Sequence, residues 1–187
     1  LFITIFSISI YLHFDTVILA MLSDNESVGY YSSSLKLVKI IIAILAAITA
    51  AMFPKMVEVF HNGDKQEFNN MVQQSYELIL SIGLPLTIFI YMMAPEIVYI
   101  LFGTHFERSI VPLQITSPLI LVVSLSSIFG FQILSVHHKD ASILFAAVMG
   151  MIISLVMSFL LIPTFKEIGA SIAILLTEIL VLILFVL

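Results

Sequence analysis

Charged side chains are scarce in this sequence of 187 residues: they make up 10% of it, while apolar residues make up 61%. Soluble domains average about 25% charged and about 45–50% apolar residues. With a mean hydropathy of +1.19, the chain has too little polar surface to cover a water-soluble globule. The composition therefore excludes a soluble domain and predicts a protein whose surroundings are lipid.

Other absences exclude whole classes of function. Cysteine is missing, so neither a disulfide framework nor a thiolate site is possible. Only 7 Lys and Arg stand against 12 Asp and Glu, which leaves no basic stripe for the phosphates of a nucleic acid. The sequence also lacks a phosphate-binding glycine loop, a nucleophile elbow and zinc-ligand spacing. We interpret the chain as non-enzymatic, and we expect no cofactor and no bound metal.

Polar breaks divide the chain into six apolar stretches. Each is long enough to cross a hydrocarbon core of about 30 Å, which takes roughly 20 residues of helix. They predict an all-α, polytopic transmembrane bundle that forms one domain over residues 1–187. The expected spans are residues 1–22, 28–53, 76–94, 110–136, 141–162 and 168–187. Pro54 and Pro163 are expected to end the second and fifth spans.

The longest polar stretch, residues 55–75, lies between the second and third spans. Asn62 and Gly63 predict a turn. Asp64 followed by Glu67 resembles a capping box, in which the aspartate side chain accepts a hydrogen bond from a free backbone N–H. We therefore expect the third helix to begin here, before it enters the membrane.

Basic residues in short loops favour a cytoplasmic N-terminus. The loops that would face the cytoplasm carry three bases and the outer loops carry two, namely Lys55, Lys65 and Lys139 against Arg108 and Lys166. Four tyrosines fall near the proposed outer face, as expected for an aromatic belt. They are Tyr30, Tyr31, Tyr91 and Tyr99.

Ionisable side chains inside the predicted spans are informative, because each costs about 2.5–3.5 kcal/mol at a helix centre. Lys36 and Lys39 share a helix face with Ser32, which gives the second span one cationic stripe. The lysine stems could snorkel to the interface, or the stripe could face a water-filled cavity and attract an anionic group. Two bases on a common face favour the cavity.

Two acidic residues also fall inside predicted spans. Asp15 lies deep in the first span, too far from the interface for so short a side chain. It could pair with Lys36 or Lys39 as a structural residue, or hold a coupling proton or sodium ion. Glu178 has no base near it in the last span, so we expect it to face the bundle interior, protonated or hydrogen-bonded.

Prolines and polar residues mark the third and fourth spans. Pro85 and Pro118 are expected to break these two helices, because a proline ring removes a backbone donor. Such breaks are common in transporters. The fourth span also carries a polar stripe that could line a cavity or join helices by hydrogen bonds. The stripe consists of Gln114, Ser117, Ser124 and Ser127.

Short motifs along nearly the whole chain recur in a recognisable order. They include Asp15-Thr16-Val17-Ile18-Leu19, Ser27-Val28-Gly29-Tyr30-Tyr31, Leu35-Lys36-Leu37, Phe53-Pro54-Lys55, Leu84-Pro85, Leu101-Phe102-Gly103, Ile162-Pro163, and Ile168-Gly169-Ala170-Ser171-Ile172-Ala173 followed by Glu178. In order and spacing the sequence resembles the polysaccharide-biosynthesis or O-antigen flippases, a branch of the multidrug/oligosaccharidyl-lipid/polysaccharide exporter superfamily.

The resemblance implies a transporter with two lobes of about six helices each that works by alternating access. This chain would be the second lobe, with the first lobe as its missing partner. Members of the family move undecaprenyl-diphosphate-linked oligosaccharide across the bacterial plasma membrane. Lys36 and Asp15 occupy positions of the family pattern, whereas Lys39 and Glu178 are added from burial cost alone.

Two other functions stay open. A cation-coupled multidrug exporter would favour an acidic cavity, and two lysines on one face speak against it. A non-transporting membrane subunit that scaffolds glycan assembly belongs to a different class.

Overall fold

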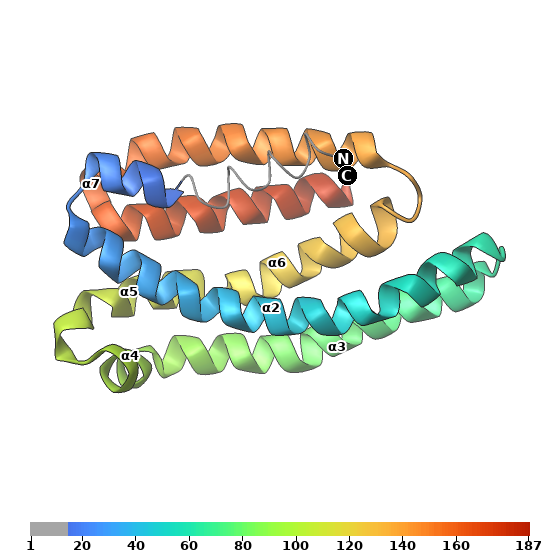
Figure 1. Ribbon diagram of the computed structural model, residues 1–187, viewed down its shortest axis with the longest axis horizontal. Coiled ribbons are helices and arrows are strands. Elements are labelled where there is room, and N and C mark those ends of the chain that lie inside the picture. Colours follow the sequence, from blue (N-terminus) through green and yellow to red (C-terminus); the bar gives the residue numbers. More distant parts are fainter. Residues whose placement is uncertain (1–14) are drawn as a thin grey trace.

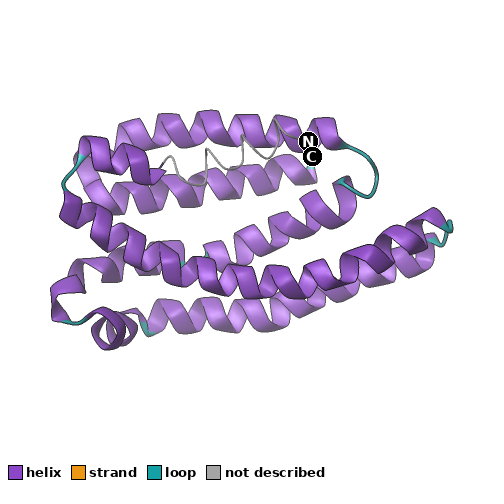
Figure 2. Cartoon of the chain, viewed as in Figure 1, coloured by secondary structure: helices purple, strands orange, loops and turns teal. Residues whose placement is uncertain are grey.

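The computed structural model describes residues 15–187, and this range is helical apart from short turns (Figures 1 and 2). The all-α prediction is confirmed for these residues. Residues 15–22 are helical, whereas most of the expected first span lies outside the described residues. The elements that follow are α2 (Asn25–His61), α3 (Lys65–Met92), α4 (Ala94–Phe102), the 3-10 helix η1 (Thr104–Ser109), α5 (Ile110–Thr116), α6 (Leu119–Ser127), the π-helical segment η2 (Ile128–Leu134) and α7 (Asp140–Val186).

Three described helices, α2, α3 and α7, are long and apolar enough to cross a membrane. A fourth span is possible if residues 104–116 and 119–134, which meet at a bend of 43°, count as one broken helix. With 47 residues, α7 would measure about 70 Å if straight, more than twice a hydrocarbon core. It doubles back instead (Figure 1), because Lys166, at φ 48° and ψ −123°, separates two helical arms.

Several helices run through prolines at which the sequence predicted an end or a break. Pro54 lies inside α2, Pro85 inside α3 and Pro163 inside α7. A proline removes one N–H donor and displaces one carbonyl. A helix in apolar surroundings survives this loss when neighbouring groups or local adjustment satisfy the freed carbonyl. The predictions that Pro54 and Pro163 end their helices, and that Pro85 breaks α3, are therefore wrong.

The polar stretch between α2 and α3 forms the tip of a helical hairpin that extends beyond the rest of the bundle (Figure 1). Gly63, at φ 79°, makes the turn, as the sequence predicted. The Asp64 carboxylate accepts a hydrogen bond from the Glu67 backbone N–H at 2.9 Å, which confirms the predicted cap. Phe60 and Phe68 pack against His137 and hold this hairpin to the loop before α7.

One hydrophobic core joins α2, α5, α6 and α7. Among its fully buried members are Val38, Leu113, Ile120, Ile162 and Ala170. The two arms of α7 also contact each other closely, since a side chain added at Gly169 would meet the Leu161 carbonyl oxygen at 2.4 Å. Large apolar side chains cover the outward faces of the long helices, an arrangement typical of proteins in lipid.

Ion pairs tie three loops together at one end of the bundle. Lys166 Nζ lies 2.7 Å from Asp24 Oδ2, and Arg108 lies 2.7 Å from Glu167 Oε1. The bonded Lys166 ammonium, together with the Ser27 backbone N–H, holds the pKa of Asp24 well below its usual range. This end therefore fixes the start of α2 relative to both arms of α7.

Candidate functional site

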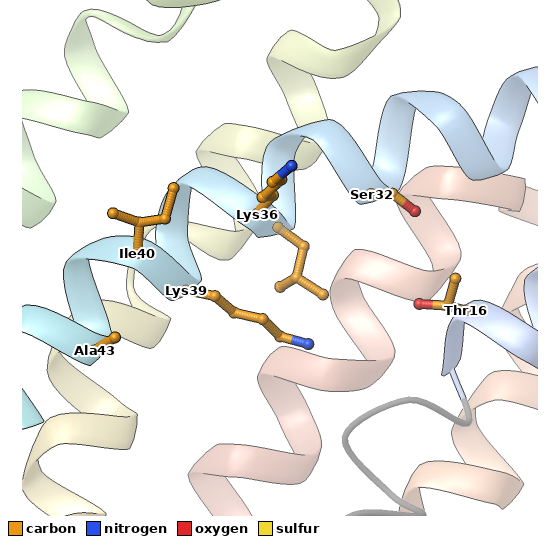
Figure 3. A pocket seen from close by; sticks show the side chains of 7 residues that line it. Thr16, Ser32, Lys36, Lys39, Ile40 and Ala43 are labelled. Carbon is orange, nitrogen blue, oxygen red and sulfur yellow. The ribbon is translucent and has the colours of Figure 1, made fainter.

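An open pocket of about 330 Å³ lies along α2, beside the helical residues 15–22. Figure 3 labels six of its lining residues, Thr16, Ser32, Lys36, Lys39, Ile40 and Ala43. Leu35 supplies part of the remaining wall. The pocket thus combines two ammonium groups and two hydroxyls with an apolar wall.

Helical periodicity places both lysines in this pocket. Ser32, Lys36 and Lys39 lie at i, i+4 and i+7 of α2, so their side chains leave the helix on one side. Lys36 is exposed and Lys39 is half-buried. In Figure 3 the Lys39 side chain extends toward the segment that carries Thr16, whereas the Lys36 nitrogen points away from it. An anion that enters the pocket would be attracted by both ammonium groups.

Asp15 lies directly behind the pocket wall at 1% exposure. It accepts hydrogen bonds from the Tyr31 hydroxyl and, at 2.8 Å, from the Thr16 backbone N–H. The positive charge of Lys39 acts on this carboxylate as well. The structure therefore brings Asp15 together with the cationic stripe, and adds a phenol that the sequence analysis did not include.

Tyr31 departs from its expected place in an aromatic belt, because its side chain is fully buried. The buried carboxylate of Asp15 requires a donor, and the Tyr31 hydroxyl supplies one. A signal for this burial is present in the sequence. Ser27, Leu35 and Val38 share a helix face with Tyr31 and are buried with it.

Glu178 lies on the second arm of α7 at 2% exposure, inside the bundle. Thr177 beside it is buried as well, and its hydroxyl donates to the Ala173 carbonyl at 2.8 Å. Glu178 is not among the residues that line the cationic pocket.

The polar stripe of the fourth predicted span is engaged with backbone groups. The chain bends at Pro118, whose ring deprives the Gln114 carbonyl of its helical donor, and the Ser117 hydroxyl donates to that carbonyl at 2.9 Å. The Gln114 amide donates at 3.4 Å to the Tyr91 carbonyl, which lacks a donor because Pro95 follows four residues later. These side chains compensate for prolines.

The other two members of the stripe are serines of α6. The Ser127 hydroxyl donates to the Ser124 carbonyl at 2.7 Å, while the buried Ser124 hydroxyl has no partner among the described residues. Neither the cationic pocket nor a second pocket of about 430 Å³ between α2 and α3 is lined by any residue of the stripe. Within residues 15–187, no three His, Asp or Glu side chains cluster as metal ligands would.

Comparisons of the sequence with known proteins place the chain in a family. The chain is 28% identical to the putative O-antigen transporter of Escherichia coli (strain K12) over 180 residues, which is 96% of the chain and 43% of that protein. It is 21% identical to the probable low-salt glycan biosynthesis flippase Agl15 of Haloferax volcanii over 159 residues, which is 85% of the chain and 34% of that protein. The chain thus spans less than half the length of these two relatives. The family described as "Polysaccharide biosynthesis protein" matches residues 1–111, more than half of the chain, and the chain belongs to that family.

Proposed function

We propose that this chain is one lobe of a flippase that moves a lipid-linked oligosaccharide, carried on undecaprenyl diphosphate, across the bacterial plasma membrane for surface polysaccharide biosynthesis. Family membership and the printed functions of the two relatives support transport of this kind. The observation that carries the proposal is the pocket in which Lys36 and Lys39 lie side by side on α2.

The chemistry of the pocket suits a diphosphate better than a cationic drug. Lys36 and Lys39 supply two positive charges, and Ser32 and Thr16 add hydroxyl donors. Each negative charge that moves outward from a negative interior gains about 2.3 kcal/mol per 100 mV. The same lysines would repel a cationic drug, so we favour an anionic headgroup over multidrug export.

The proposed lobe has six spans. The helix that includes residues 15–22, α2 and α3 are the first three, and the bent helix from η1 to η2 is the fourth. The two arms of α7, which meet at Lys166, are the fifth and sixth. A second lobe would complete a two-lobe transporter of the multidrug-exporter type, and the length of the relatives leaves room for one. The cationic pocket would face the cavity between the lobes.

Asp15 is the proposed site of a coupling proton or sodium ion. It is a buried carboxylate that lies next to the pocket, and the Lys39 charge acts on it. Loss or gain of a cation at Asp15 would therefore change the electrostatic attraction of the pocket for an anion. Glu178, on the second arm of α7, is a second buried carboxylate that could take part.

The test is a glycan-translocation assay on the whole protein, in which Lys36→Ala and Lys39→Ala are combined. We expect translocation to fall at least tenfold while the protein still reaches the membrane, because two charge-assisted contacts of about 1.4 kcal/mol or more in total are lost. The variant Lys36→Arg with Lys39→Arg keeps both charges and should retain more activity. Lys65→Ala, at an exposed position outside the pocket, is the matched control.

Each alternative predicts a different result. Unchanged translocation in the double alanine variant would falsify the headgroup role of the lysines. Loss of drug efflux with intact glycan translocation would indicate a multidrug exporter. A scaffold subunit would support glycan assembly in all of these variants, because its role needs no pocket.

A further inference from the structure

The short helix α4 lies across the direction of the long helices. Figure 1 views α4 almost end-on, while α2, α3 and α7 run across the picture. Pro95 stands in its first turn, where a missing N–H costs nothing, and Gly103, at φ 80°, ends it. With nine residues it measures about 14 Å and is too short to cross a membrane.

The outward side of α4 carries large apolar side chains beside one exposed acidic residue, Glu96. Ala94 and Val98 are fully buried in the core. On the outward side Ile100 is 81% exposed and Leu101 is 56% exposed. Exposed apolar patches mark contacts with a partner or with lipid. The outward side of α4 therefore needs an apolar partner.

This apolar surface is continuous with the outward face of a membrane-spanning helix. Met92, at 69% exposure, ends α3 directly before α4. One turn earlier, Ile88 and Phe89 of the same helix are also exposed. Since α3 is apolar enough to span the membrane, its exposed side chains meet lipid, and the patch on α4 extends that contact around the end of the helix.

Polar groups lie next to the apolar patch that Ile100 and Leu101 form on α4. Glu96 is exposed at the edge of α4, and η1 follows with His105, Glu107 and Arg108. Partial burial and the nearby charge of Glu107 raise the pKa of Tyr99. An apolar side next to charged groups and a tyrosine is the pattern of a helix at a membrane–water interface.

We propose that α4 is an interfacial helix that lies in the plane of the membrane, with Ile100 and Leu101 inserted at the boundary between acyl chains and headgroups. Its partner is the lipid bilayer itself, and its buried side fastens the end of α3 to the core. This role does not depend on what the protein transports.

Spin labels test the placement in the whole protein, reconstituted in vesicles of phosphatidylethanolamine and phosphatidylglycerol. Because this chain has no cysteine, Ile100→Cys and Leu101→Cys each give one labelling site in it, with any cysteine outside it replaced. Lys65→Cys, at the exposed polar start of α3, is the polar control, and Ile88→Cys marks a deeper position on α3.

We expect labels at positions 100 and 101 to collide several-fold more with oxygen than with a water-soluble nickel chelate, and to be shallower than the label at 88. The label at 65 should show the reverse preference. High nickel accessibility at 100 and 101 would place this side of α4 in water and overturn the proposal. Low accessibility to both reagents would overturn it too, since a second lobe or another copy would then cover the patch.

Discussion

Gln132 lies on the π-helical segment η2, and only 2% of it is exposed. Its amide Nε2 donates to the Thr49 carbonyl at 3.1 Å, next to the carbonyl that Pro54 leaves without a helical donor in α2. Its Oε1 has no hydrogen-bond partner among the described residues. One side chain thus joins the π-helical segment to the part of α2 that Pro54 disturbs, and half of its own amide stays unsatisfied.

The contacts of Gln132 predict how strongly each of its variants lowers the free energy of unfolding. Gln132→Leu should lower the free energy of unfolding by about 1 kcal/mol, because the bond to Thr49 is lost together with the unsatisfied oxygen. Gln132→Glu should cost more, because an ionised carboxylate cannot donate and would point oxygen at oxygen. Unfolding of the purified protein in mixed detergent micelles measures both values.

The control is Gln73→Leu, at an exposed position of α3 whose amide bonds Glu77 at 2.8 Å. It should change stability little, because water replaces the lost bond. If the leucine variant of Gln132 proved less stable than its glutamate variant, the amide of Gln132 would not be acting as a donor to Thr49.

At the scale of elements, the two arms of α7 meet through small residues. A Cβ atom added at Gly169 would lie 2.4 Å from the Leu161 carbonyl oxygen, and backbone on the facing arm cannot move aside cheaply. We therefore expect Gly169→Ala to lower stability by about 1–3 kcal/mol or more. Gly29→Ala is the matched control, because nothing lies within 4 Å of its added Cβ and alanine favours the helix. Thermal unfolding in detergent measures both, and equal melting temperatures would mean that the arms are not in contact here.

The sequence predicted correctly that the chain is helical, but it did not predict every position at which a helix ends. The cap at Asp64 and the turn at Gly63 follow from local chemistry alone, so the sequence predicted both correctly. The turn inside α7 occurs at Lys166 instead of Pro163. Proline ends helices reliably only where water competes for the backbone, and these helices are apolar on most sides.

In the candidate site, too, features within one helix were predictable and contacts between helices were not. Periodicity alone placed Ser32, Lys36 and Lys39 on one face, because all three belong to a single helix. The contact between Tyr31 and Asp15 joins two helices and depends on their packing, so no spacing rule could reveal it. The Ser117 hydroxyl bonds the Gln114 carbonyl, which Pro118 leaves without a helical donor, so this bond follows from local sequence. The bond from the Gln114 amide to the Tyr91 carbonyl joins α5 to α3 and depends on packing instead.

Over the whole molecule, one end is tied by polar contacts among distant segments. Arg108 of η1 pairs with Glu167 of α7 and lies over the ring of Tyr30 in α2, 5.3 Å from its centre. The Ser34 hydroxyl donates to the Ser109 carbonyl at 2.8 Å. Through these contacts α2, η1 and both arms of α7 should move as one body. A lobe that rocks against a second lobe would require that rigidity.

The Arg108–Glu167 pair is asymmetric, and the asymmetry predicts how its variants behave. Glu167 is 3% exposed and its Oε2 has no hydrogen-bond partner among the described residues, while the Arg108 side chain is half exposed. Arg108→Ala should therefore cost about 1–3 kcal/mol of unfolding free energy, because it leaves the buried Glu167 carboxylate without its partner while water reaches the half-exposed Arg108 position. Combining it with Glu167→Ala should recover much of that loss. Exchanging the two residues should not, since a buried guanidinium would replace the carboxylate.

The exposed pair of Lys55 and Glu67, 3.7 Å apart on the hairpin, is the matched control. Lys55→Ala should change stability by at most about 1 kcal/mol, because water screens both partners. Unfolding in mixed micelles gives the values for a double-mutant cycle on each pair. If Arg108→Ala were as mild as Lys55→Ala, the contact between η1 and α7 would not hold this end together. The helices there could then move separately during transport.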